Sequence, residues 1–86
     1  MPIVSAFFGI VIRMFYRDHF HAEHARQQAK FDFGGELVAG EIRSGNARVR
    51  IREWAQQHHA ELETNWANMK TGRPLESIEP LREGKS

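Results

Sequence analysis

The hydrophobic pattern of this chain changes its period near Ser44, and that change restricts the fold more than any other feature. From residue 3 to residue 42, apolar side chains alternate with polar ones or form short runs, as in β-strands. After Ser44 they recur every three or four residues as far as about residue 71, as in an amphipathic helix. A strand-rich half followed by a helical half predicts one α+β domain.

We predict an antiparallel sheet of three to four strands in the first half of the chain. The strands are expected at about 5–16, 19–24, 27–33 and 36–42. The first has apolar residues on both faces, which favours a central or doubly covered strand, and Gly9 marks either a bulge or a close approach of another element. Residues 24–27 are a predicted hairpin connection, and Gly34-Gly35 is a strong turn signal. Tight turns of this kind favour antiparallel pairing.

One long helix is predicted over about residues 46–71. Its apolar stripe consists of residues at helical spacing: Ala47, Ile51, Trp54, Ala55, His58, Leu62, Trp66 and Met69. The stripe keeps its phase through His58 and His59, and neither proline nor glycine interrupts it. We therefore predict a single helix rather than two helices with a hinge. Ser44 or Asn46 is the expected N-cap.

An extended tail is expected after the helix, which Gly72 and Pro74 bring to an end. The apolar residues of this tail, Leu75, Ile78 and Leu81, are predicted to pack on the core. A length of 86 residues fits a single domain. We assign that domain to residues 1–81 and expect residues 82–86 to form a disordered tail.

The composition excludes several functional classes. The chain has no cysteine, so disulfides, thiolate metal sites and cysteine nucleophiles are excluded. Its formal net charge of +1 gives no global field that would attract nucleic acid or a membrane. The apolar start of the chain ends at Arg13 after about a dozen residues, fewer than the roughly 20 that a membrane span requires. We therefore expect a cytoplasmic protein with no membrane partner.

Short motifs spread over nearly the whole chain carry a resemblance to a known family. They are Met1-Pro2-Ile3, Phe7-Phe8-Gly9-Ile10, Ile12-Arg13-Met14, Asp18, His19-Phe20-His21-Ala22-Glu23, Arg52-Glu53-Trp54-Ala55, Glu61-Leu62, Asn65-Trp66 and Ile78-Glu79-Pro80-Leu81. In this order they resemble the bacterial family called domain of unknown function 4160. Its members are small prokaryotic proteins, often encoded beside another short open reading frame, and some have been taken as toxins of toxin–antitoxin pairs. The resemblance implies a small protein partner and a toxin-like role.

One departure from the family pattern lies beside a group of histidines. The family usually reads Asp-His-x-Pro-Pro-His-Phe-His-Ala, whereas Asp18 is followed directly by His19-Phe20-His21 in this chain. One histidine and both prolines of the pattern are therefore absent, which puts any site that needs that extra histidine in doubt. His24 also stands where the family commonly has tyrosine.

His19, His21 and Glu23 are the main candidates for chemistry, because alternate residues of a strand share one face. We favour a polar strand face in which the histidines bond to backbone or to Asp18. One alternative is a histidine cluster for acid–base work, since imidazole titrates near neutral pH. The least favoured alternative is a metal site with two imidazoles and a carboxylate as ligands. No cofactor is expected apart from that unfavoured divalent metal.

Arg43, Arg48 and Arg52 are candidates for phosphate or nucleic-acid binding. Arg48 and Arg52 lie one turn apart near the predicted helix N-terminus, where guanidinium groups and the helix dipole both attract phosphate. The alternative is a solvated face with glutamate partners, which is what charged helix faces usually are. His58 lies within the apolar stripe and is expected to be buried and hydrogen-bonded.

These observations favour a protein-binding module that acts with a small protein partner, as the toxin half of a toxin–antitoxin-like pair. The first alternative is a histidine- or metal-dependent nuclease, in which His19 and His21 act as acid, base or ligands while Arg48 and Arg52 hold phosphate. That hypothesis requires both groups to converge in one pocket. The second alternative is a nucleic-acid-binding regulator that reads DNA with a β-ribbon. The sequence contains no complete catalytic set, so we favour a protein that is not an enzyme. Assembly into homo-oligomers is left as an open alternative.

Overall fold

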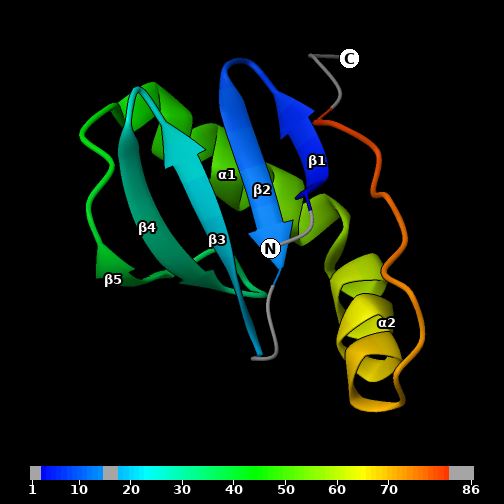
Figure 1. Cartoon of the computed structure of the whole chain (residues 1–86). Helices are drawn as coiled ribbons and strands as arrows, with labels where there is room; N and C mark the ends of the chain where they lie inside the picture. Colours follow the sequence, from blue (N-terminus) through cyan, green and yellow to red (C-terminus); the bar gives the residue numbers. More distant parts are fainter. Residues whose placement is uncertain (1–2, 15–17, 82–86) are drawn as a thin grey trace.

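The computed structural model describes residues 3–14 and 18–81, which form a five-stranded sheet backed by helices (Figure 1). The strands are β1 (Ile3–Phe7), β2 (Ile10–Met14), β3 (His19–His24), β4 (Gln27–Asp32) and β5 (Leu37–Gly40). Every neighbouring pair is antiparallel, and the strands lie in the sheet in the order of the sequence. The predicted α+β class and antiparallel sheet are therefore confirmed.

The core lies between one face of the sheet and helix α1 (Gly45–Gln57), which crosses behind the strands in Figure 1. Helix α2 (His59–Lys70) continues beside the sheet and contacts the C-terminal tail. The largest fully buried side chains come from both layers: Trp54, Phe20, Phe31, Ile10, Ile12, Met14, Ile42, Ile51, Leu62 and Asn65. The opposite face of the sheet is not covered by any helix in the part of the chain that the structure describes.

The predicted first strand, 5–16, is wrong, because it is divided into β1 and β2 by a turn at Phe8-Gly9. Both turn residues have positive φ, 51° and 75°, which gives a two-residue hairpin rather than a bulge at Gly9. The sequence did not reveal this turn, because Phe8 continues the apolar run. The Arg50 guanidinium lies over the Phe8 ring, with its Cζ atom 4.1 Å from the ring centroid. The sheet thus gains a fifth strand, and residues 15 and 16 of the predicted strand lie outside the described residues.

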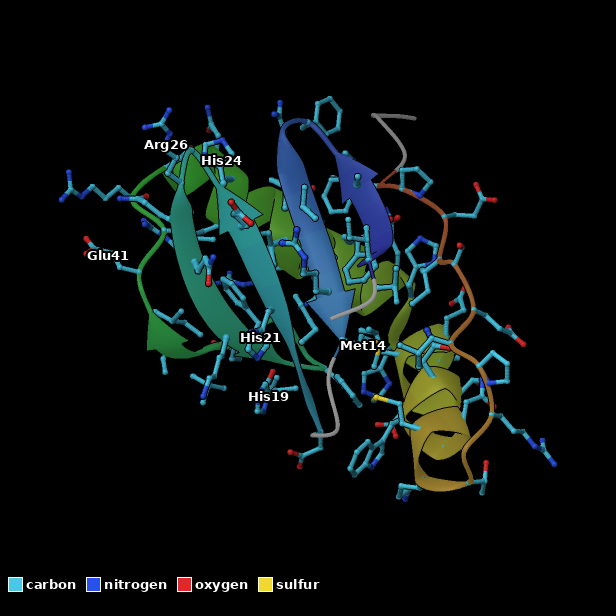
Figure 2. All side chains as sticks on the ribbon, viewed as in Figure 1. Met14, His19, His21, His24, Arg26 and Glu41 are labelled. Carbon is cyan, nitrogen blue, oxygen red and sulfur yellow. The ribbon has the colours of Figure 1, made fainter. Side chains whose placement is uncertain are left out.

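The predicted hairpin at residues 24–27 is confirmed, with Ala25 and Arg26 as its two turn residues. Figure 2 shows His24 and Arg26 at one end of this hairpin and His19 at the other. Ala25 and Arg26 have φ values of 52° and 66°, a region that residues with a Cβ atom adopt at a cost. Asparagine followed by glycine suits this turn type better.

Replacing Ala25→Asn and Arg26→Gly together is expected to raise the free energy of unfolding by about 1 kcal/mol, because both changes relieve positive-φ strain. Urea unfolding followed by circular dichroism measures this change. As a control, Ala60→Gly on the exposed face of α2 should lower the stability by about 1 kcal/mol, since that backbone is helical. A double variant that unfolds at the same urea concentration as the wild type would contradict the strain argument.

The prediction of one helix over 46–71 is also wrong, because His58 interrupts it with φ −116° and ψ 28°. Helix α1 has 13 residues and is therefore about 20 Å long, close to the length of a strand of five or six residues. A straight continuation would leave the sheet. The change of direction at His58 instead lets Leu62 and Met69 of α2 join the core. Ser44 is the N-cap, as predicted, and its side chain accepts from the Ala47 N–H at 3.1 Å.

The tail packs on the core as predicted, with Ile78 and Leu81 buried and Leu75 partly buried. Its backbone also bonds to the domain: the Ile78 N–H donates to the Val4 carbonyl at 2.7 Å. This bond places the tail along the outer edge of β1, where Figure 1 shows it beside that strand. The predicted disordered tail, 82–86, lies outside the described residues. Neither of the described helices has the length and apolar character of a membrane span.

Candidate functional site

His19, His21 and Glu23 of β3 share the open face of the sheet, as the alternation of strand residues predicts. Phe20 and Ala22, between them, are buried against the helix layer. The His19 and His21 side chains project from β3 on the side away from α1 (Figure 2). Their imidazole rings stack with centroids 5.3 Å apart and an angle of 20° between the ring planes.

Glu23 does not combine with the two histidines. Its carboxylate lies 2.8 Å from the Arg13 guanidinium of the neighbouring strand β2, and both side chains are about one-third exposed. Nowhere in residues 3–14 and 18–81 do three His, Asp or Glu side chains gather closely enough to hold a metal ion. His19 and His21 thus form a stacked pair, and Glu23 forms a separate ion pair with Arg13 on the same face.

The register of the strands places a row of nitrogen-bearing side chains across this face. Arg13 of β2 is opposite His21 of β3, and His21 is opposite Lys30 of β4. Lys30 is in turn opposite Ala39 of β5, so the row ends in a methyl group at the edge of the sheet. Arg13 and Lys30 were not among the sequence-based candidates. The hairpin turn at Ala25 would have revealed Lys30, because it fixes the partner of every residue in β3 and β4.

Two hollows flank His21 on the open face. The first is lined by Arg13, His21, Ala22, Glu23 and Gln28. The second lies toward the edge and is lined by His21, Gln28, Ala29, Lys30, Ala39 and Gly40. His21 and Gln28 therefore contribute to both hollows, and the second reaches β5, where small residues leave it open.

The protonation of His21 is governed by its neighbours. Partial burial lowers the pKa of His21, and the nearby His19 and Lys30 lower it further, because each disfavours a positive charge on the ring. The His21 imidazole is consequently neutral near pH 7 and can donate one hydrogen bond and accept another.

Lys30 is the cation of this face that has no ion partner among the described residues. Asp32, two residues along the same strand, bonds instead to the β4–β5 turn. Its Oδ1 accepts from the Gly34 and Glu36 N–H groups at 2.9 and 3.0 Å. Arg13 is neutralised by Glu23. Unpaired positive charge is therefore found at Lys30, close to the edge of the sheet.

The three candidate arginines each make a different contact within the domain. Arg48 donates from Nη1 to the carbonyls of Ile42, at 2.6 Å, and Arg43, at 3.1 Å, so it holds the connection that enters α1. The exposed Arg43 pairs loosely with Glu41, with a distance of 3.6 Å between Nε and Oε2. Arg52 packs its backbone and stem against Gly35, where a Cβ atom would lie 2.8 Å from the Arg52 Cα.

The histidines and the helix arginines lie on opposite sides of the sheet. Helix α1, which carries Arg48 and Arg52, backs the covered face, and neither hollow beside His21 is lined by an α1 residue. The convergence that the nuclease hypothesis requires is therefore not present in the described residues. His58, in contrast, has a side chain only 13% exposed, and its Nδ1 lies 3.0 Å from Glu61 Oε2, as expected for a structural histidine.

The β5 edge is the other unusual surface. All four residues of β5 are exposed, with Leu37 49% and Val38 58% accessible. Lys30 pairs with Ala39 and Phe31 with Leu37, so Val38 is the extra residue of a bulge. β5 is a terminal strand of the sheet, with β4 on its inner side. An apolar strand without charge or proline at this position can accept a further strand.

The fold and these surfaces define a two-layer α+β domain with one open polar sheet face and one open apolar edge. The chain belongs to the family described as domain of unknown function (DUF4160), whose model matches residues 9–67. The match runs from the β1–β2 turn into α2, so it includes both hollows and the β5 edge. Neither a curated protein nor a solved structure matches the chain. The resemblance recognised in the sequence motifs is thereby confirmed.

Proposed function

We propose that the protein is a protein-binding module that takes up an extended strand of a partner protein at β5. The observation that carries this proposal is the exposure of an apolar terminal strand, with Leu37 and Val38 about half accessible. Backbone groups on the outer side of such a strand supply hydrogen bonds to a partner strand, and alternate side chains supply contacts. Natural proteins usually protect such edges with charge, proline, a bulge, a very short strand or a covering segment; β5 is short and has a bulge at Val38, but it has neither charge nor proline.

The two edges of the sheet differ in a way that supports β5 as the binding surface. At β1 the tail of the chain lies alongside, with the Ile78 N–H bonded to the Val4 carbonyl. Trp54 also donates from Nε1 to the Glu79 carbonyl at 2.8 Å, which fixes the tail in this position. At β5 the described chain provides no comparable cover. A partner strand would therefore extend the sheet on the β5 side.

The role proposed for this module is one half of a pair with a small partner, with this chain as the toxin-like member. The family resemblance supports that role, since members are often encoded beside another short open reading frame. The nuclease hypothesis has less support, because Arg48 bonds to the connection that enters α1, Arg52 packs against Gly35, and the helix that carries both lies across the sheet from the histidines. We therefore propose that the chain acts by binding rather than by catalysis.

Val38→Lys is expected to weaken the complex with the product of the adjacent open reading frame at least tenfold in Kd, because a flexible charge at the edge opposes strand pairing. Isothermal titration calorimetry with the purified pair measures this. Val49→Lys is the matched control: Val49 is 51% exposed on α1, so the same substitution there should leave Kd unchanged.

Growth of a bacterial host provides the second readout. Expression of the wild-type chain alone should arrest growth, and coexpression of the partner should restore it; Val38→Lys should cancel the rescue, whereas Val49→Lys should not. Equal Kd values for the two variants would contradict binding at β5. Normal growth with intact soluble protein would contradict the toxin-like role.

A further inference from the structure

The row of side chains across the open face ends beside the proposed binding edge. Neighbouring strands are about 4.8 Å apart, so a strand added to β5 would lie about 10 Å from the β4 backbone, with only Ala39 between it and Lys30 at this level. Ala39 and the adjacent Gly40 leave space above the sheet, and this space is the hollow that Lys30 and His21 line. The long, flexible Lys30 side chain can therefore extend over Ala39 toward the added strand.

We infer that the partner strand carries an acidic side chain opposite Ala39, whose carboxylate binds in this hollow between Lys30 and His21. The inference rests on the proposed strand addition at β5 and names the chemistry of the partner. Charge complementarity carries it. Glu23 already has Arg13, and Asp32 is occupied by the β4–β5 turn, so Lys30 is the charge that lacks a counterpart in the described chain.

A carboxylate on a strand fits this surface better than the other occupants. Tight binding of a nucleic-acid backbone requires several cations along its path. Among the described residues this face offers one unpaired cation, and the helix that carries Arg48 and Arg52 is on the other side of the sheet. A second copy of the chain would bring β5 against β5, and the sequence Leu37-Val38-Ala39-Gly40 has no acidic side chain to supply. An acidic strand of a different protein can both pair with the β5 edge and supply the carboxylate that Lys30 lacks in the described chain.

Binding of such a strand should depend on pH through His21. The groups that face His21 are His19 and Glu23 on its own strand, Arg13 on β2, and Lys30 with Asp32 on β4, whereas β5 presents the uncharged Ala39. A carboxylate that arrives beside His21 favours the imidazolium form and raises its pKa, so binding takes up a proton and strengthens as the pH falls from about 7.5 to about 5.5.

Three matched peptides test the inference on the full chain labelled with ¹⁵N. Each is a capped peptide of alternating threonine and valine, and they differ only in a central glutamate, glutamine or lysine. All three should shift the amide resonances of β5, and the glutamate peptide should bind about threefold to fivefold more tightly than the glutamine peptide, as expected for a partly exposed ion pair. The lysine peptide should bind most weakly. The preference for glutamate should increase from pH 7.5 to pH 5.5.

Two variants locate the preference in the hollow. Lys30→Gln should remove the difference between the glutamate and glutamine peptides and leave the affinity for glutamine unchanged, while Lys70→Gln on α2 should preserve the difference. His21→Gln should abolish the pH dependence, whereas His19→Gln should retain it.

The outcomes separate the two proposals. If no peptide shifts the β5 amides, strand addition fails and the inference falls with it. If all three bind equally, strand addition stands and the acidic partner is overturned. If a single-stranded oligoribonucleotide shifts Lys30 and His21 without the β5 amides, and the glutamate peptide does not displace it, the face is a nucleic-acid surface and the inference is overturned.

Discussion

Trp54→Ala is expected to lower the free energy of unfolding by about 4 kcal/mol, the largest loss that we foresee for a single residue of this domain. Trp54 is fully buried at the centre of the core. Its indole stacks on Phe7 at 5.7 Å and meets the edge of Phe20 at 5.5 Å, so it joins β1, β3 and α1. A domain of this kind has only about 5–15 kcal/mol of stability, so the variant should be close to unfolding.

Urea unfolding of Trp54→Ala, Trp54→Phe and Trp66→Ala tests this expectation. Trp54→Phe keeps most of the ring but removes the N–H that donates to the Glu79 carbonyl, so it should cost about 1–2 kcal/mol and still fold. Trp66 is only partly buried at the margin of the core, so Trp66→Ala should lower the free energy of unfolding clearly less than Trp54→Ala does. Equal losses at the two tryptophans would show that Trp54 is not the centre of the core.

The period of the hydrophobic pattern predicted burial well but not the continuity of the backbone. Six of the eight residues in the stripe from Ala47 to Met69 are buried, and His58 and Trp66 are partly buried. The helix nevertheless breaks at His58, because helical periodicity indicates which side chains face the core and not whether the backbone is continuous. When a helix break keeps the apolar residues in phase, the hydrophobic pattern of the sequence does not reveal the break. The Phe8-Gly9 turn was missed for a similar reason, since an apolar residue occupies a position where turns usually have asparagine or glycine.

The candidate site was predictable only as far as single elements determine it. Alternation along one strand placed His19 and His21 on one face correctly. Arg13 and Lys30 reach that face through the pairing of three strands, and pairing depends on turns that the sequence marks weakly. The contacts of Arg48 could not be predicted, because spacing on a helix cannot reveal that its guanidinium bonds to the carbonyls of Ile42 and Arg43.

Asn65 was absent from the predicted stripe because it is polar, yet it is 1% exposed and fastens the tail to α2. Its Nδ2 donates to the Glu76 carbonyl at 2.8 Å, and its Oδ1 accepts from the Glu76 N–H at 2.8 Å. Asn65→Leu removes both bonds at once and leaves both backbone groups of Glu76 without these partners. We expect a loss of about 3 kcal/mol in the free energy of unfolding, measured by urea titration.

The same variant should act locally on the β1 edge, and this separates it from a general loss of stability. When the tail detaches, the Ile78 N–H leaves the Val4 carbonyl, so its hydrogen exchange should accelerate far more than that of amides in β3.

A newly uncovered β1 edge should also promote association of the chain, seen as a concentration-dependent increase in apparent mass. Asn68→Leu is the matched control, because Asn68 lies on the same helix and its side chain makes no hydrogen bond to the described tail; this variant should leave Ile78 exchange unchanged. If exchange at Ile78 and in β3 accelerates equally in Asn65→Leu, the tail does not cover β1 as an independent unit, and the contrast between a covered β1 edge and an open β5 edge no longer supports binding at β5.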